Sequence, residues 1–219
     1  MVATRQSHRT HIESFDSALK QLCLSDEKYQ LVHAATEFCG ELRCAEKDRL
    51  ALEMVEILAQ LNLDATSLAT AYLTPYFLAQ QIVVVDVSDK FNKDVGLLLK
   101  GVEQMATIST LAHASNGQVQ VDKIRRMLLA MVEDVRAVVI KLAQQVCYLR
   151  EVKNAEEEER VIAAKETTNI FAPLANRLGI GQLKWELEDF AFRYLHPDTY
   201  KRIAKLLEEK RLDREAYMS

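Results

Sequence analysis

Apolar residues recur every three or four positions along most of the chain, which is the period of an amphipathic helix. Capping residues such as Ser25, Asp26, Asp64 and Thr66 precede several of these patterns. The predicted helices extend over residues 25–42, 45–62, 64–81, 88–108, 121–134, 134–152, 156–180, 182–195 and 198–219. Residues 82–87 are strand-like, but the run is short and isolated, which favours a connector or a helix entry. We therefore expect an all-α, compact multi-helix bundle with no substantial sheet.

One predicted helix is unusual because it carries no charge. Residues 67–82 read SLATAYLTPYFLAQQI, with Pro75 in the middle of the stretch. A proline inside a helix removes one backbone N–H and kinks or ends the helix. The stretch is either a core helix or the remains of a functional site.

Other segments give expectations about caps, loops and burial. Ser88 is expected to cap the helix that follows it, and residues 110–120 are the clearest loop. Pro173 should kink or end the helix over 156–180. Within the helix over 182–195, the apolar spacing predicts burial of Leu183, Trp185, Leu187 and Phe190.

Composition narrows the classes of function. The chain is 49% apolar and 27% charged with a net charge of −4, so nothing favours direct DNA binding or an anionic membrane. The polar N-terminus lacks an export signal and no apolar run approaches the ~20 residues of a membrane span, which favours the cytoplasm. None of the four cysteines forms a C-x-x-C pair, which favours buried, reduced thiols over a metal site.

Direct signals for chemistry are few. The five histidines do not form a metal-binding pattern, and the sequence lacks a G-x-x-x-x-G-K-[ST] phosphate loop, a G-x-G-x-x-G motif and a G-x-S-x-G elbow. Basic residues from Lys201 to Arg214 alternate with acidic ones, which is typical of a solvated helix face. The same face could alternatively contact a following domain or RNA.

A resemblance adds more than these patterns. Residues 122–144, 163–197 and 200–215 closely resemble the N-terminal part of long RelA/SpoT-type proteins, and APLANRLGIGQLKWELED at 172–189 is the most specific stretch. The resemblance covers the chain from about Ala45 onward. It implies an HD-type phosphohydrolase region, in which active members use Mn²⁺ to break down the alarmone (p)ppGpp. It also implies that the longer protein is a GTP pyrophosphokinase whose synthetase domain follows this region.

The family's hydrolase pattern places replaced residues at its functional positions. The resemblance implies that Thr74 and Pro75 stand where active members have the His-Asp pair, and that Gln144 replaces a later metal-binding Asp. It likewise implies that Leu50 stands in place of the first metal-binding histidine, and that Leu78 and Ala79 stand in place of an acidic pair. Tyr148 stands in place of a nucleotide-binding Asn. Four metal positions without an anionic or imidazole ligand should not hold a divalent ion, so we expect no metal and no cofactor in this domain.

The domain expectation is an N-terminal helical extension over 1–44, a degenerate HD hydrolase-like domain over 45–195 and a helical connector over 196–219. The first functional hypothesis is an inactive domain that regulates the synthetase domain of the same polypeptide by contact. The longer protein would meet the ribosome and uncharged tRNA, while the oligomeric state stays open. A second hypothesis is an interaction or nucleotide-binding module, and a third is an active hydrolase with substitute ligands from Glu53, Glu56, Asp86 or Asp89.

Overall fold

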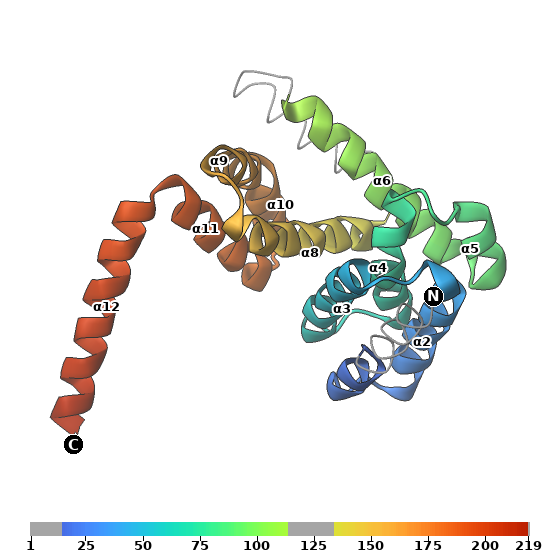
Figure 1. The fold of residues 1–219 in the computed structure, drawn as a ribbon, viewed down its shortest axis with the longest axis horizontal. Helices are drawn as coiled ribbons and strands as arrows, with labels where there is room; N and C mark the ends of the chain where they lie inside the picture. The colour runs from blue at the N-terminus through green and yellow to red at the C-terminus, as the bar shows by residue number, and fades with distance from the viewer. Residues whose placement is uncertain (1–14, 114–133, 219) are drawn as a thin grey trace, which may run out of the picture. The chain divides into compact units, whose positions relative to one another are not determined.

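The computed structural model describes residues 15–113 and 134–218 (Figure 1). All regular structure within these two ranges is helical, which confirms the expected all-α fold. The chain divides into two compact units, residues 1–147 and 148–219, and the boundary falls within helix α8 (Val135–Glu151).

The first unit is built around α4 (Ala65–Leu78). Both α2 and α3 pack against α4, α4 also contacts α6, and α5 packs on α6. Residues 15–21 are helical as well. The remaining bounds are α2 Asp26–Cys39, the 3₁₀ turn η1 Gly40–Leu42, α3 Ala45–Gln60, α5 Val84–Lys90 and α6 Lys93–His113.

The uncharged stretch is the central helix of this unit. Every residue from Ser67 to Phe77 on α4 is buried, so the helix is enclosed on all sides and needs no polar face. The Asp64 side chain caps its start by accepting a hydrogen bond from Ser67 N at 3.1 Å. The helix ends at Leu78 and not at Gln81, because Gln80 adopts a left-handed φ of 57° that breaks the helical path.

Two local predictions next to α4 are wrong. Ser88 lies inside α5, and the α6 helix is instead capped by Asn92, whose side chain accepts a hydrogen bond from Val95 N at 2.9 Å. Helix α6 continues to His113, so residues 110–113 of the predicted loop are helical. Residues 114–120, and the helix predicted over 121–134 apart from Asp134, lie outside the described residues.

The second unit contains an irregular helical turn that the sequence pattern did not predict. A π-helical turn over Thr167–Phe171 connects α9 to α10. Pro173 is the second residue of α10, and its missing N–H interrupts the helical hydrogen-bond ladder next to this turn. Pro173 therefore does not end the helical path. The bounds are η2 Val152–Asn154, α9 Glu157–Glu166, α10 Ala172–Arg177, α11 Gly181–Leu195 and α12 Pro197–Met218.

Burial along α11 follows the helical period with one exception. Leu183 and Leu187 are fully buried as predicted, and Phe190 is half-buried. Trp185 is 74% exposed, so its predicted burial is wrong. The apolar stripe of α11 is narrower than its apolar residues suggest, because Trp185 lies two positions from both Leu183 and Leu187 and therefore on the opposite side of the helix.

Candidate functional site

Four of the seven positions that the resemblance marks as replaced lie at the C-terminal end of α4, three within the helix and Ala79 as its C-cap. Thr74 is completely buried, and its Oγ1 donates a hydrogen bond to Thr70 O at 2.8 Å within the same helix. Pro75 beside it is buried as well. This pair therefore packs as helix core, where a threonine hydroxyl is satisfied by the carbonyl one turn earlier.

The other two positions on α4 lie at its end. Leu78 is half-buried and Ala79 is the exposed C-cap residue, whose N–H donates to Pro75 O at 3.3 Å. Neither side chain can accept or donate a proton. Leu50 is half-buried on α3, the helix that packs against α4. These five residues supply no oxygen or nitrogen ligand except the Thr74 hydroxyl.

The last two replaced positions lie one turn apart on α8. Gln144, in the first unit, accepts a hydrogen bond from Lys141 Nζ at 3.0 Å on its own helix. Tyr148, in the second unit, donates its hydroxyl to Glu159 Oε1 at 3.5 Å. Burial, followed by the nearby carboxylates of Glu159 and Glu166, raises the pKa of Tyr148, so this side chain stays a neutral phenol at physiological pH.

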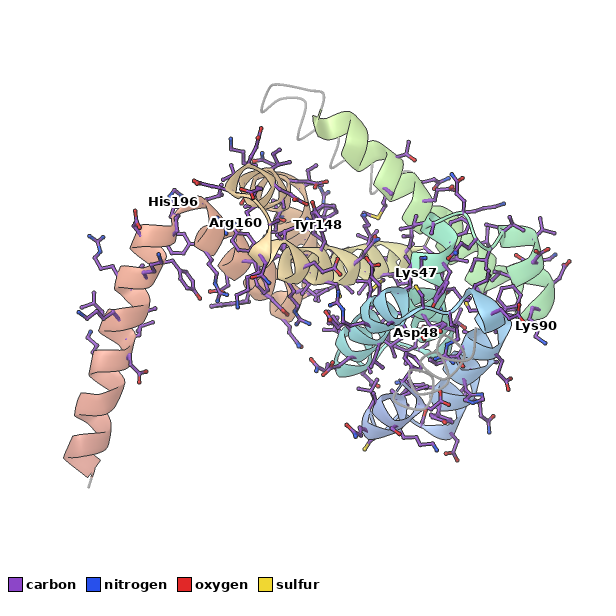
Figure 2. All side chains as sticks on the ribbon, in the orientation of Figure 1. Lys47, Asp48, Lys90, Tyr148, Arg160 and His196 are labelled. Carbon is purple, nitrogen blue, oxygen red and sulfur yellow. The ribbon has the colours of Figure 1, made fainter. Side chains whose placement is uncertain are left out.

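Sequence reasoning missed a buried polar cluster in the first unit. Figure 2 labels Asp48 on α3. This residue is completely buried and accepts hydrogen bonds from Tyr72 at 2.6 Å and from Tyr76, both on α4. Arg43 binds the other carboxylate oxygen through Nε and Nη2, each at 2.9 Å. The signal that could have found it is an acidic residue on the apolar side of one helix beside two tyrosines four positions apart on the next.

The electrostatics of this cluster favour a structural role over acid–base chemistry. Burial alone would raise the pKa of Asp48, but the hydrogen bonds from Tyr72, Tyr76 and Arg43 hold it below its usual 3.8. Burial and the hydrogen bonds to Asp48 raise the pKa of both tyrosines. Burial, then the Asp48 charge, raises the pKa of Cys39 to about 12, so this thiol is not a nucleophilic thiolate at neutral pH.

The substitute metal ligands considered from the sequence are not gathered. Asp86 and Asp89 are exposed on α5, Glu56 is exposed on α3, and Glu53 accepts a bond from Arg49 Nη1 at 3.0 Å. Within residues 15–113 and 134–218, no group of three or more His, Cys, Asp or Glu side chains is placed to hold a metal ion. The structure thus describes no ready alternative to the family's ligand set in these ranges.

The first unit also contains an open pocket of about 460 Å³ between residues of the first described helix, α2 and η1. Its lining consists of Asp16, His33, Thr36, Glu37, Gly40, Glu41 and Arg43. None of the seven replaced positions lines it. With three carboxylates around it, this pocket is poorly suited to a nucleotide phosphate.

Comparison with known proteins agrees with the helical architecture. Residues 46–181 match the HD domain family, a range that includes all seven replaced positions. In the part of the chain that the structure describes, no helix combines the length and the apolar character needed to cross a bilayer.

Several curated relatives are similar over the whole chain. A GTP pyrophosphokinase of Escherichia coli (strain K12) is 49% identical over 229 residues, covering 100% of this chain and 31% of the relative. A GTP pyrophosphokinase of Haemophilus influenzae is 45% identical, with the same coverage. A probable guanosine-3′,5′-bis(diphosphate) 3′-pyrophosphohydrolase of Synechocystis is 38% identical over 160 residues, covering 73% of this chain and 21% of the relative.

The chain thus spans about a third of the length of the GTP pyrophosphokinases that it matches from end to end. The family match covers more than half of this chain, and its relatives include enzymes named GTP pyrophosphokinase and one named a probable guanosine-3′,5′-bis(diphosphate) 3′-pyrophosphohydrolase. The chain belongs to the HD domain family, in the form found in RelA/SpoT-type proteins.

Proposed function

We propose that this chain is a catalytically inactive (p)ppGpp-hydrolase-like domain of a cytoplasmic GTP pyrophosphokinase, and that it regulates the synthetase domain of the same polypeptide by contact. The observation that carries the proposal is Thr74. The resemblance places Thr74 where active members have a metal-binding histidine, and here its side chain is fully buried and its hydroxyl donates a hydrogen bond to Thr70 O. A metal ion there would meet a neutral oxygen already committed to its own helix.

Hydrolysis by an HD domain depends on a metal ion that lowers the pKa of a bound water and polarises a phosphoryl oxygen. Dehydration of a divalent ion is compensated only by several charged or imidazole ligands. Leu50, Thr74, Pro75 and Gln144 offer none. The helical core around these positions is nevertheless complete, which supports a retained structural role.

The longer polypeptide supplies the regulatory part of the proposal. The matched GTP pyrophosphokinases are about three times the length of this chain, and in such a protein a domain without chemistry can still bias the state of its neighbour by binding one conformation better. We propose that the whole protein transfers pyrophosphate from ATP to GTP or GDP, and that it meets the ribosome and uncharged tRNA.

The direct test is an assay of the 219-residue chain with ppGpp and Mn²⁺, using the Synechocystis relative as the active control. We expect no release of pyrophosphate above the protein-free background. Turnover that scales with protein and metal concentration would overturn the claim of inactivity. Metal analysis after purification gives an independent check, because stoichiometric Mn²⁺ or Zn²⁺ would contradict it.

The regulatory claim needs the longer protein. Synthetase activity should change when residues 1–195 are removed, and ppGpp hydrolysis measured in parallel should be absent in both forms. Unchanged synthesis and unchanged control would contradict regulation by contact and would favour a separate interaction module. Binding of labelled ppGpp to the 219-residue chain in the presence of a chelator would favour the nucleotide-binding version of that module.

A further inference from the structure

The open pocket of about 460 Å³ in the first unit carries an excess of negative charge. Three carboxylates line it, those of Asp16 on the first described helix, Glu37 on α2 and Glu41 on η1. Arg43 is the only lysine or arginine among its described lining residues, and Arg43 Nε and Nη2 each lie 2.9 Å from Asp48 Oδ2. The charge of Arg43 is therefore already balanced, and the pocket is acidic.

Two of these carboxylates are accessible to a group that enters from solvent. The Glu37 side chain is 72% exposed, and His33 Nδ1 lies 3.9 Å from its Oε1, near the limit of an ion pair. Glu41 is exposed as well. Between α2 and η1, Gly40 has a left-handed φ of 44°, and a Cβ placed there would meet no atom within 4 Å. The pocket is therefore open on the side of Glu37 and Glu41.

A basic stretch of the same chain leads directly to this pocket. Residues 1–12 include Arg5, His8, Arg9 and His11 and no acidic residue. The stretch precedes the buried Phe15, whose neighbour Asp16 lines the pocket. An extended chain covers about 3.3–3.6 Å per residue, so the seven residues from Arg9 to Asp16 can span about 24 Å. Both arginines can therefore reach any wall of the pocket.

We propose that the basic stretch over residues 5–11 docks in this acidic pocket, with the guanidinium groups of Arg5 and Arg9 paired to its carboxylates. Arginine suits the contact because its planar fork of N–H donors matches the two oxygens of a carboxylate. Covalent linkage gives the stretch a high effective concentration at the pocket, which favours it over a free polyamine or a basic segment of another protein. This contact goes beyond the proposed function and does not depend on it.

The test is hydrogen exchange of the backbone amides of residues 5–11 in the 219-residue chain. We expect exchange at low salt to be roughly tenfold slower than in an isolated peptide of the same sequence. In about 1 M salt the exchange should return to the peptide rate, because exposed charge pairs are screened. Exchange at the peptide rate in low salt, or protection that persists unchanged in high salt, would overturn the proposal. Protection that increases with protein concentration would also overturn it, because a second copy would then supply the stretch.

Matched variants separate this pocket from the acidity of the chain in general. Glu37→Gln/Glu41→Gln should abolish the protection of residues 5–11. The control Asp86→Asn/Asp89→Asn removes the same amount of charge from exposed positions on α5 that do not line the pocket, and it should leave the protection intact. Equal exchange of residues 5–11 in the two variants would overturn the assignment to the pocket.

Charge reversal on both sides of the contact gives a second readout. Arg5→Glu/Arg9→Glu should abolish the protection, and adding Glu37→Arg/Glu41→Arg to the same chain should restore at least part of it. A combined variant that stays unprotected would overturn the pairing of these residues. The measurements require neither hydrolysis nor synthesis, so their failure is distinguishable from failure of the proposed function.

Discussion

Arg43 and Asp48 form a buried ion pair, with Nη2 and Oδ2 2.9 Å apart and side chains 6% and 0% exposed. Asp48 also accepts the hydroxyls of Tyr72 and Tyr76, so a single carboxylate connects the start of α3 to the middle of α4. A buried charge is costly unless it is paired and hydrogen-bonded, and the Asp48 carboxylate is both paired with Arg43 and hydrogen-bonded by Arg43, Tyr72 and Tyr76. Asp48 on α3 and its two tyrosine partners on α4 lie on the same two helices as most of the replaced hydrolase positions, while Arg43 directly follows η1.

Replacing Asp48 with Asn should destabilise the chain strongly. The change leaves the Arg43 guanidinium buried without its counter-charge, which costs about 3–5 kcal/mol for a broken buried pair. Urea unfolding followed by circular dichroism measures the loss. Removing both charges in Arg43→Met/Asp48→Leu should cost less than the two single changes added together, and a purely additive result would contradict the coupling.

Acid should weaken the fold through the same carboxylate. The pKa of Asp48 is below 3.8 in the folded chain, so its contribution is fully present above the unfolded pKa and is lost as pH falls through the folded value. The free energy of unfolding should therefore hold steady down to about pH 4–5 and decline at lower pH. Urea midpoints measured between neutral pH and about pH 3 check this sign, and stability that rises on acidification would contradict it.

Tyr76→Phe isolates the Asp48 contribution to this acid response. The variant removes one hydroxyl donor without changing the ring, and should cost about 1.5–3 kcal/mol, the range for a hydrogen bond to a charged group. It should also make the acid decline smaller and end it at higher pH, because the carboxylate loses part of what holds its folded pKa below the unfolded value. Asp64→Asn is the comparison, since its own lowered pKa arises on a half-exposed surface and not in this cluster.

A second ion pair should contribute much less to the free energy of unfolding than the Arg43–Asp48 pair does. Arg136 Nη1 lies 2.5 Å from Asp64 Oδ2, joining the first residues of α8 to the cap of α4, and the two side chains are 29% and 48% exposed. Solvent screening at this exposure limits the coupling to about 0.2–1 kcal/mol. A double-mutant cycle with Asp64→Asn and Arg136→Gln measures it. A coupling as large as that of the Arg43–Asp48 pair would show that the exposed pair is in fact desolvated.

The fluorescence of the single tryptophan should show that its side chain is exposed to solvent. Trp185 is 74% exposed, so its fluorescence should be red-shifted and readily quenched by acrylamide. Trp185→Ala should change stability by less than about 0.5 kcal/mol, as expected for a surface position. Leu187→Ala, two residues away and fully buried, should cost about 2–5 kcal/mol. Blue-shifted, protected emission from the 219-residue chain would contradict the exposure.

The helical period predicted most of the described helices, because apolar spacing directly reflects which side of a helix is buried. The helical period failed where a backbone conformation or a side-chain cap sets the end of a helix. The end of α4 depends on the left-handed conformation of Gln80, and the start of α6 depends on Asn92 and not on Ser88. Trp185 shows a further limit, since composition alone does not tell whether a large apolar side chain faces the core.

The candidate site was predictable only in part. The resemblance located Thr74 and Pro75, and the structure shows both to be buried in the helix core. Spacing alone could not pair Asp48 with Tyr72 and Tyr76, because these contacts join residues 24 and 28 positions apart and depend on how α3 packs against α4. The expected domain boundaries and the expected absence of a metal stay predictions.

The π turn over Thr167–Phe171 contains one residue more than a regular helix would use there. Each residue advances an α-helix by about 100° around its axis. Deleting a single residue from the turn would therefore swing the following segment by that amount and carry Leu174 and Ala175 out of the core in which they now lie. The irregular turn thus sets which side of α10 faces the core, and a shorter, more regular version of this segment would fold less well.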